Sequence, residues 1–344
     1  MPTASIDFTL ASIAMILIAI GAISGASMVL APNLDRESSS VERYYQIGRY
    51  LLLSRGDPQD WGSGGIPTQL GLASGNEPYG LDIDKVTRLN LANYYAVNYS
   101  TLWQALGVDD ISFSLSVEPL FNLALSKVSS QIQDRGTIYN FTAQTVKDGY
   151  PISCQIRYYT VVGNSTFSSS GSTDSQGYGT IQFKLPNSLN GTALLIGIAK
   201  AEADMVSFNV VPFAHLVDRP NKVGMYATLS PLSFNLTVEL EEGAMIWNTA
   251  AFSWSYSFNL TASGSNYDIP QLIDSSPILI TMTGTNGTYH WAEWVAYPQV
   301  PLEVGADMED IYTVSDLHLI PFTVEIHGAY YRFEISFRSP AEYD

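Results

Sequence analysis

The side chains best suited to chemistry are scattered along the chain. The densest acidic stretch is EVGADMEDIYTVSD at 303–316. Carboxylates are ligands for Ca²⁺, but this stretch lacks the aspartate spacing and the glycine of an EF-hand loop. We therefore interpret it as a solvated acidic loop, with a calcium site as the alternative. Its five carboxylates are Glu303, Asp307, Glu309, Asp310 and Asp316.

The histidines and the cysteine indicate structural roles. The four histidines are His215, His290, His318 and His327, and none has a metal-binding partner two or four residues further along the chain. A single cysteine, Cys154, excludes an internal disulfide and a thiolate metal cage. We predict that Cys154 is an inert core residue.

The sequence contains none of the short motifs that mark common active sites. P-loop, G-x-S-x-G, H-E-x-x-H, C-x-x-C and G-x-G-x-x-G patterns are all missing. We therefore expect no enzymatic activity, no cofactor and no metal. A glycan-active enzyme with paired carboxylates is an alternative, although the sequence does not fix the separation of about 5–9 Å that glycosidases need.

Seven N-x-S/T sequons follow residue 34, and none has proline in the middle. Asparagine, serine and threonine all favour turns, so one sequon alone means little. Seven of them indicate an N-glycosylated, extracytoplasmic surface. We expect N-linked glycans on several of the seven asparagines, with the best candidates in the turn-like stretches around Asn164 and Asn286. The asparagines are Asn98, Asn140, Asn164, Asn190, Asn235, Asn259 and Asn286.

The composition is that of a folded protein with few charges. Hydrophobic residues make up 46% of the chain and can form cores, whereas only 14% of residues are charged, against about 25% in an average soluble domain. Glycans and polar uncharged side chains can provide the missing solvation. The net charge of −17, without a visible basic patch, argues against a nucleic-acid partner.

The chain opens with a long apolar segment. No charge occurs from Phe8 to Leu34, and a helix of 27 residues would reach ~40 Å, more than the ~30 Å hydrocarbon core of a bilayer. A cleaved signal peptide would have a basic start and a shorter apolar run. We predict a membrane-length helix that packs against other helices. The residues expected to mediate this packing are the small pairs Gly21/Gly25 and Ala22/Ala26, together with Asp7, which is unfavourable in lipid without a donor.

This opening resembles a known family. SIDFTLASIAMILIAIGAISGASMVL is similar to the N-terminal helix of archaeal type IV pilin-like surface proteins, and the similarity extends through YYQIGRYLLLSRGDPQDWG (44–62) and the segment 81–117. The resemblance implies a helix that first anchors the subunit in the membrane and then packs in the core of a filament. Its partners would be membrane lipid and then copies of the same chain. The family's basic residues before the cleavage point are missing from MPTAS.

The rest of the chain predicts β structure. In ISCQIRYYTVV, Ile152, Cys154, Ile156 and Tyr158 alternate with polar residues, as in a half-buried strand. The frame VKDGYPISC…NST…STDSQGYGTIQFKLP resembles immunoglobulin-like (Ig-like) domains of prokaryotic surface proteins. We expect a mainly β fold in which a long N-terminal hydrophobic α-helix is followed by two Ig-like β-sandwich domains. The expected divisions are 1–55 (helix and amphipathic continuation), 56–133 (loops and short helices leading into β), 134–220 (first sandwich) and 221–344 (second β-rich domain).

These observations predict a structural cell-surface protein. In this hypothesis, the chain self-associates through residues 6–34 and displays glycosylated β domains in a filament or adhesive role. The alternative is a single-span, membrane-anchored extracytoplasmic protein that binds a partner or belongs to a membrane complex.

Overall fold

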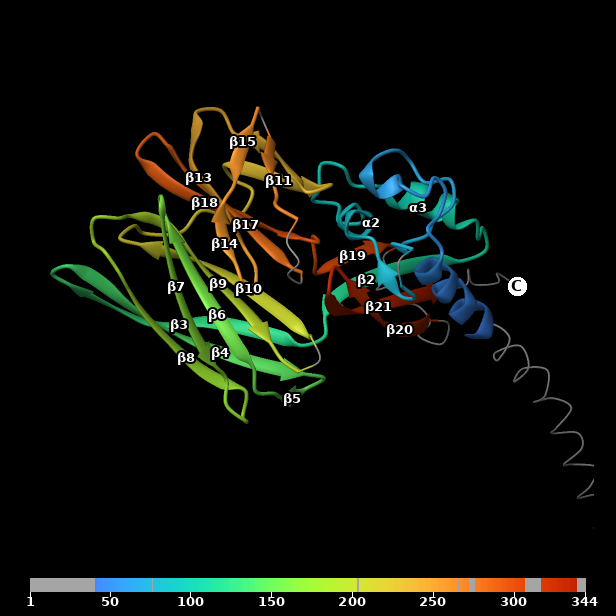
Figure 1. Ribbon diagram of the computed structural model, residues 1–344, viewed down its shortest axis with the longest axis horizontal. Helices are drawn as coiled ribbons and strands as arrows, with labels where there is room; N and C mark the ends of the chain where they lie inside the picture. Colours follow the sequence, from blue (N-terminus) through green and yellow to red (C-terminus); the bar gives the residue numbers. More distant parts are fainter. Residues whose placement is uncertain are drawn as a thin grey trace, which may run out of the picture. The chain divides into compact units, whose positions relative to one another are not determined.

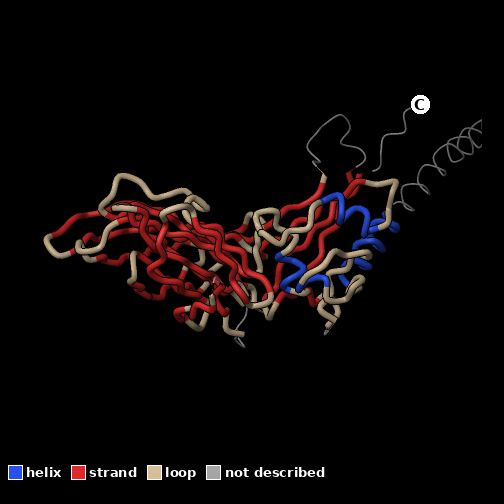
Figure 2. The backbone as a smooth tube through the Cα atoms, turned by 90° about the horizontal axis from the view of Figure 1, so that it is seen from above, coloured by secondary structure: helices blue, strands red, loops and turns tan. Residues whose placement is uncertain are grey.

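The computed structural model describes residues 41–75, 77–202, 204–264, 266–271, 276–306 and 317–338. The chain divides into two compact units, 1–49 and 50–344. In the described part, the chain is helical from 41 to 53 and then mainly β (Figures 1 and 2). Three modules make up the second unit.

The first module is a β-sandwich. Its two sheets have the strand orders β3-β4-β5, with β8 also paired to β4, and β10-β9-β6-β7. Alternate side chains of both sheets meet in one core, which includes Phe141, Ile156 and Leu195. The strands are β3 (Asn122–Gln133), β4 (Gly136–Lys147), β5 (Tyr150–Pro151), β6 (Gln155–Val162), β7 (Ser165–Ser172), β8 (Tyr178–Leu185), β9 (Gly191–Lys200) and β10 (Val206–His215).

The second module is also a β-sandwich. Its sheets have the orders β11-β12-β16-β15 and β14-β13-β17-β18. Leu236 from one sheet and Ile280 and Trp291 from the other lie in its core. The strands are β11 (Ala227–Leu232), β12 (Asn235–Leu240), β13 (Ala244–Phe252), β14 (Ser257–Asn259), β15 (Thr261–Ser263), β16 (Asn266–Asp268), β17 (Ile278–Asn286) and β18 (Tyr289–Tyr297).

The third module, which we call the sheet module, combines segments from both ends of the described chain. Its five strands have the order β1-β20-β21-β2-β19, and β1 runs parallel to β20. Helix α3 packs on β2 through Tyr99 and Phe113, whose ring centroids are 5.3 Å apart. Both sandwiches are therefore inserted between β2 and β19. The elements are η1 (Trp61–Ser63), β1 (Gly80–Leu81), α2 (Ile83–Thr87), α3 (Tyr99–Leu106), β2 (Ser112–Pro119), β19 (Leu302–Gly305), β20 (Leu317–Ile326) and β21 (Ala329–Arg338).

This architecture corrects the expected fold class. The mainly β sandwich fold is confirmed, but the expected sequence of one long hydrophobic helix and two sandwiches is wrong. Within the described residues, no helix has both the length and the apolar composition required to cross a bilayer. The sheet module is the second difference, because β2 pairs with β21 across more than 200 residues of sequence, where no local pattern identifies the partner.

Local sequence patterns agree with the structure at the level of single strands and turns. Cys154, Ile156 and Tyr158 are buried, while the intervening Gln155 and Arg157 are exposed, as the alternation predicts. In the turn between β7 and β8, the Asp174 carboxylate accepts hydrogen bonds from the backbone N–H groups of Gln176 and Tyr178, at 2.8 and 3.0 Å. The turn is closed by side-chain-to-backbone bonds that aspartate commonly makes.

Candidate functional site

The acidic stretch lies only partly within the described chain. Glu303 is an exposed residue of β19, and its carboxylate is 3.5 Å from the Ser114 hydroxyl. The other four carboxylates, Asp307, Glu309, Asp310 and Asp316, lie outside the described residues. In the described part of the chain, no three histidine, cysteine, aspartate or glutamate side chains are grouped to hold a metal ion.

The histidines and Cys154 occupy separate places. His215 is fully buried, where its ring nitrogens lie 2.9 Å from the Tyr139 hydroxyl and 3.1 Å from the Pro186 carbonyl. Burial lowers the pKa of His215 and raises that of the Cys154 thiol. His290, His318 and His327 lie in β18, in β20 and in the β20–β21 turn.

The residues proposed for helix packing lie outside the described residues. These are Asp7, Gly21, Ala22, Gly25 and Ala26. Their role stays a prediction.

All seven sequon asparagines have solvent access. Asn140 in β4 and Asn286 at the end of β17 are half-buried, and the other five are exposed. Asn164 belongs to the two-residue turn between β6 and β7. Asn235 and Asn259 lie in strands, and both have outward-facing, exposed side chains.

Two buried cations hold the loop that follows the first helix. The Lys85 ammonium, on α2, donates to the carbonyls of Arg55 and Ala73 at 2.8 and 3.1 Å. Arg88 donates to the carbonyls of Trp61, Gly65 and Tyr95. Burial lowers the pKa of Lys85. These cations donate hydrogen bonds to backbone carbonyls of an irregular segment that has few sheet partners, so they stabilise its conformation.

Two carboxylates, the buried Glu293 and the half-buried Asp84, connect other segments to the second sandwich. Glu293 accepts hydrogen bonds from the backbone N–H groups of residues 224, 225 and 226 and from the Asn221 amide, at 2.6–3.1 Å. Asp84 accepts hydrogen bonds from the Tyr297 hydroxyl at 2.7 Å and from the Ser233 backbone N–H at 2.7 Å. Burial raises the pKa of both carboxyls, although these hydrogen bonds oppose the rise.

Sequence analysis did not identify these four residues. Lys85 lies within the short helix α2 and Arg88 is its C-cap, and periodicity alone cannot show that these two cations point inward. Asp84 and Glu293 contact residues 149 and 67–72 positions away. Only the folded chain brings such groups together.

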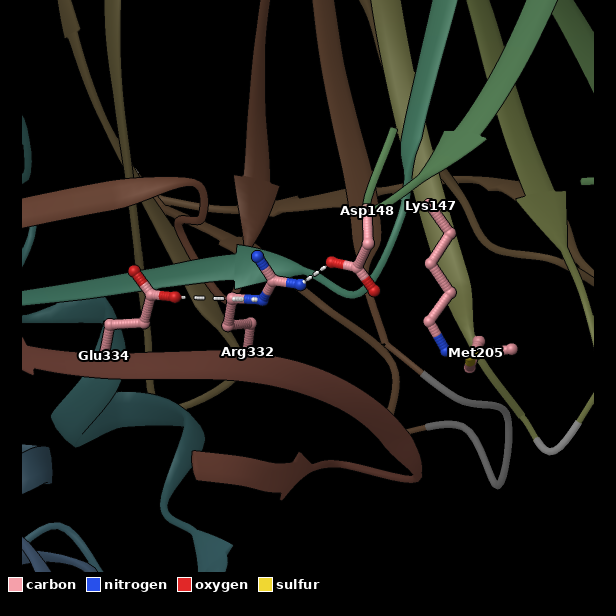
Figure 3. Close-up of polar contacts among 5 residues, drawn as sticks. All are labelled: Lys147, Asp148, Met205, Arg332 and Glu334. Carbon is pink, nitrogen blue, oxygen red and sulfur yellow. Dashed lines mark hydrogen bonds and ion pairs between the residues drawn. The ribbon is translucent and has the colours of Figure 1, made fainter. Parts of the chain in front are cut away.

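A first cleft lies where the first sandwich meets the sheet module. It has a volume of 650 Å³, and its lining includes Glu118, Asp148, Trp294 and Arg332. Arg332 of β21 bonds to the Asp148 carboxylate in the β4–β5 turn, and its Nε lies 3.9 Å from Glu334 (Figure 3). The Trp294 indole N–H is buried without a hydrogen-bond partner among the described residues. The Arg332 guanidinium already pairs with the Asp148 carboxylate of the same chain.

A second cleft, which we call the Trp247 cleft, lies between the two sandwiches. Its volume is 540 Å³. Trp247 is the extra residue of a β-bulge in β13, because the register with β17 shifts between Ile246 and Asn248. A bulge re-aims a side chain, and this indole remains 45% exposed. The lining is Gly163, Asn164, Ser188, Leu189, Asn190, Ile246, Trp247 and His290.

Aromatic and polar groups meet in the Trp247 cleft. The His290 ring centroid is 4.5 Å from that of Trp247, and a His290 ring nitrogen lies 3.1 Å from the Asn190 carbonyl. The Thr283 hydroxyl donates to the Gly163 carbonyl at 2.6 Å and joins β17 to the β6–β7 turn. The exposed indole can stack on the apolar face of a ligand ring, while the neighbouring amides and the imidazole can form hydrogen bonds with polar groups at the edge of that ring.

Comparisons with known proteins do not assign the chain to a family. No family model matches the sequence, and no curated protein matches it. Among solved structures, HBP35 of Porphyromonas gingivalis aligns with a TM-score of 0.20 at 10% identity, covering 52% of this chain and 64% of that protein. Red sea bream transglutaminase aligns with a TM-score of 0.21 at 9% identity, covering 52% of this chain and 31% of that protein. Similarities this weak carry no argument about fold or function.

Proposed function

We propose that this chain is a non-catalytic structural protein of the cell surface that displays glycosylated β modules. The observation that supports it best is the solvent access of all seven sequon asparagines. A glycan cannot occupy a sandwich core, so inward-facing sequons would have argued against glycosylation. The low charge content of 14% agrees with a surface solvated by sugar.

The described residues favour a structural role over catalysis. Lys85, Asp84 and Glu293, whose pKa values are shifted by burial, are engaged by backbone or side-chain hydrogen bonds that fix loops. A group with a shifted pKa in an active site faces a cleft that admits substrate. Lys85 and Glu293 are buried, whereas Asp84 lines a cleft of 650 Å³, where the Tyr297 hydroxyl and the Ser233 N–H bind its carboxylate. Self-association through residues 6–34, suggested by the pilin-like resemblance, stays a prediction because those residues lie outside the described part.

Mass spectrometry of protein from its native organism tests the proposal. We expect an intact mass above that of the bare chain, with glycopeptides at several of the seven asparagines. An intact mass equal to the bare polypeptide would reject the glycosylated surface role. Electron microscopy of the same material tests assembly, because the structural role predicts ordered filaments or arrays of the chain.

A second candidate is an extracytoplasmic binding protein, favoured by the 650 Å³ cleft beside Arg332. Its volume falls within the range of about 300–1,000 Å³ that is typical of small-ligand sites. This role predicts discrete particles in electron microscopy and a ligand whose affinity falls in an Arg332→Met variant. Ordered assemblies with no such ligand would favour the structural role.

A further inference from the structure

The Trp247 cleft has two sequon asparagines in its lining, Asn164 and Asn190. We infer that the glycan attached to Asn164 folds back into this cleft, where its first sugar stacks on the Trp247 indole. The inference rests on the proposed function, since it requires that the chain be glycosylated. The ligand of the cleft would be an N-linked saccharide, and it would be attached to the same chain.

The geometry of the β6–β7 turn places Asn164 beside the indole. Gly163 precedes it with φ +56°, as the first residue of a two-residue hairpin turn. A Cβ built on Gly163 would lie 3.6 Å from the six-membered ring of Trp247. The residue that bears the sugar is therefore adjacent in sequence to a backbone position in van der Waals reach of the indole.

The two sequons differ in how accessible their threonines are. Thr166, which completes the Asn164 sequon, is exposed. Thr192, which completes the Asn190 sequon, is buried, and its hydroxyl lies 2.8 Å from the Asn221 N–H and 3.1 Å from the Tyr289 hydroxyl. A sequon must be reached by the enzyme that modifies it. In the folded chain, the Asn164 sequon is therefore accessible to that enzyme, whereas the Asn190 sequon is partly buried.

The chemistry of the cleft suits a sugar ring. A pyranose has an apolar C–H face that gains by covering an exposed aromatic face, and hydroxyls that require hydrogen-bond partners. Trp247 provides the aromatic surface, while His290 and the Asn190 amide provide polar groups at its edge. The cleft, at 540 Å³, is in the size range of small-ligand sites. Stacking there would strengthen the contact between the two sandwiches, because Asn164 and Trp247 belong to different ones.

A double-mutant cycle on glycosylated protein tests the inference. Thr166→Ala removes the sequon but keeps Asn164 and Trp247, and Trp247→Leu removes the flat ring but keeps an apolar side chain. We expect Thr166→Ala to lower the Tm by about 2 °C in the wild-type background and to have no effect in the Trp247→Leu background. Acrylamide quenching provides a second readout. Trp247 fluorescence, obtained by subtracting the Trp247→Leu signal, should be better shielded with the glycan than without it.

The control is Thr261→Ala, which removes the sequon of Asn259 on β14, outside the lining of the Trp247 cleft. Its effect on the Tm should be the same with and without Trp247. Equal Tm losses for Thr166→Ala in both backgrounds, together with unchanged quenching, would overturn the inference.

Glycopeptide masses separate this inference from the proposed function. A bare Asn164 beside other occupied sequons would overturn the inference and leave the glycosylated surface role intact, whereas seven bare asparagines would remove both. A free N-acetylhexosamine tests the source of the saccharide. If it raised the Tm only with Trp247 present, while Thr166→Ala had no effect, the occupant would be an external saccharide and the attached glycan would be excluded.

Discussion

At the scale of single residues, the loop at 55–73 depends on the buried Lys85 ammonium. Replacing it by methionine keeps the length of the side chain but leaves the carbonyls of Arg55 and Ala73 without their donor. We expect Lys85→Met to lower the free energy of unfolding by about 2 kcal/mol, because a hydrogen bond from a charged donor is lost and buried acceptors remain. Urea denaturation measures this loss. Lys222→Met, at an exposed position, is the matched control and should change stability little.

Glu293 makes a prediction about pH. Burial raises the pKa of its carboxyl above the ordinary value of 4.5, so the folded chain binds more protons than the unfolded chain between 4.5 and the raised pKa. The contribution of this group to stability is therefore complete below pH 4.5 and is lost as the pH rises through the folded-state pKa. Glutamine does not titrate. We expect the difference in unfolding free energy, wild type minus Glu293→Gln, to fall as the pH increases across this window.

Urea denaturation between pH 4 and pH 8 measures that difference directly. Glu239→Gln, on an exposed part of β12, controls for the loss of one negative charge. A difference for Glu293→Gln that stays constant or grows with pH would contradict the assigned direction of the pKa shift.

The burial of Cys154 can be predicted from the sequence, whereas the burial of Glu293 cannot, and the reason is physical. Cys154 alternates with polar neighbours along one strand, so its own segment indicates that it faces a core. A buried carboxylate requires donors, and those of Glu293 come from residues 221–226, about 70 positions earlier. No pattern within either segment indicates that they meet.

At the scale of elements, the pairing of β2 with β21 can be tested by cross-linking. Ser116 and Glu334 are directly opposite in the register. Facing residues of an antiparallel pair have Cα atoms about 4.5–5.5 Å apart, within the range that a disulfide spans. We expect Ser116→Cys with Glu334→Cys to form a disulfide on mild oxidation, so that thiol labelling after denaturation finds only Cys154.

The control moves one cysteine along β21. Arg338 lies four residues beyond Glu334, or about 13 Å along the strand, which is too far for a disulfide to Ser116. Three free thiols should remain in that variant. Three free thiols in the facing pair as well would mean that β21 belongs elsewhere, as in the expected arrangement where residues 221–344 form one domain.

The difference between the predicted and the observed elements has a single origin. Periodicity shows which face of a strand is buried, and it correctly identified both sandwiches as β regions. It cannot identify the neighbouring strand, because the alternation in β2 would suit any sheet. In the structure, β3 begins at Asn122 and pairs with β4, so this hairpin joins residues on both sides of position 134.

At the scale of the whole molecule, insertion of the sandwiches into the sheet module allows the chain to be divided. Val117 of β2 and Leu302 of β19 are paired neighbours, although 184 residues separate them in sequence. A two-residue Asn-Gly turn can join such a pair as a β-hairpin. Residues 41–117 joined by Asn-Gly to 302–338 would then retain the five strands of the sheet module, with β2 shortened by two residues. We expect this shortened chain to fold with dispersed amide signals in its NMR spectrum.

The excised piece, residues 118–301, should also fold, because the described strands of both sandwiches pair within the sheets of those sandwiches. Its stability should be lower than in the whole chain, since Tyr297 loses its bond to Asp84 and Asp148 loses Arg332. Residues 41–117 alone provide the decisive control. There β2 lacks both neighbours, β19 and β21, so the buried side chains of Phe113, Leu115 and Val117 lose their sheet partners. We expect that fragment to be unfolded. If it folded as well as the joined chain, the C-terminal hairpin would not be required and the nested arrangement would be wrong.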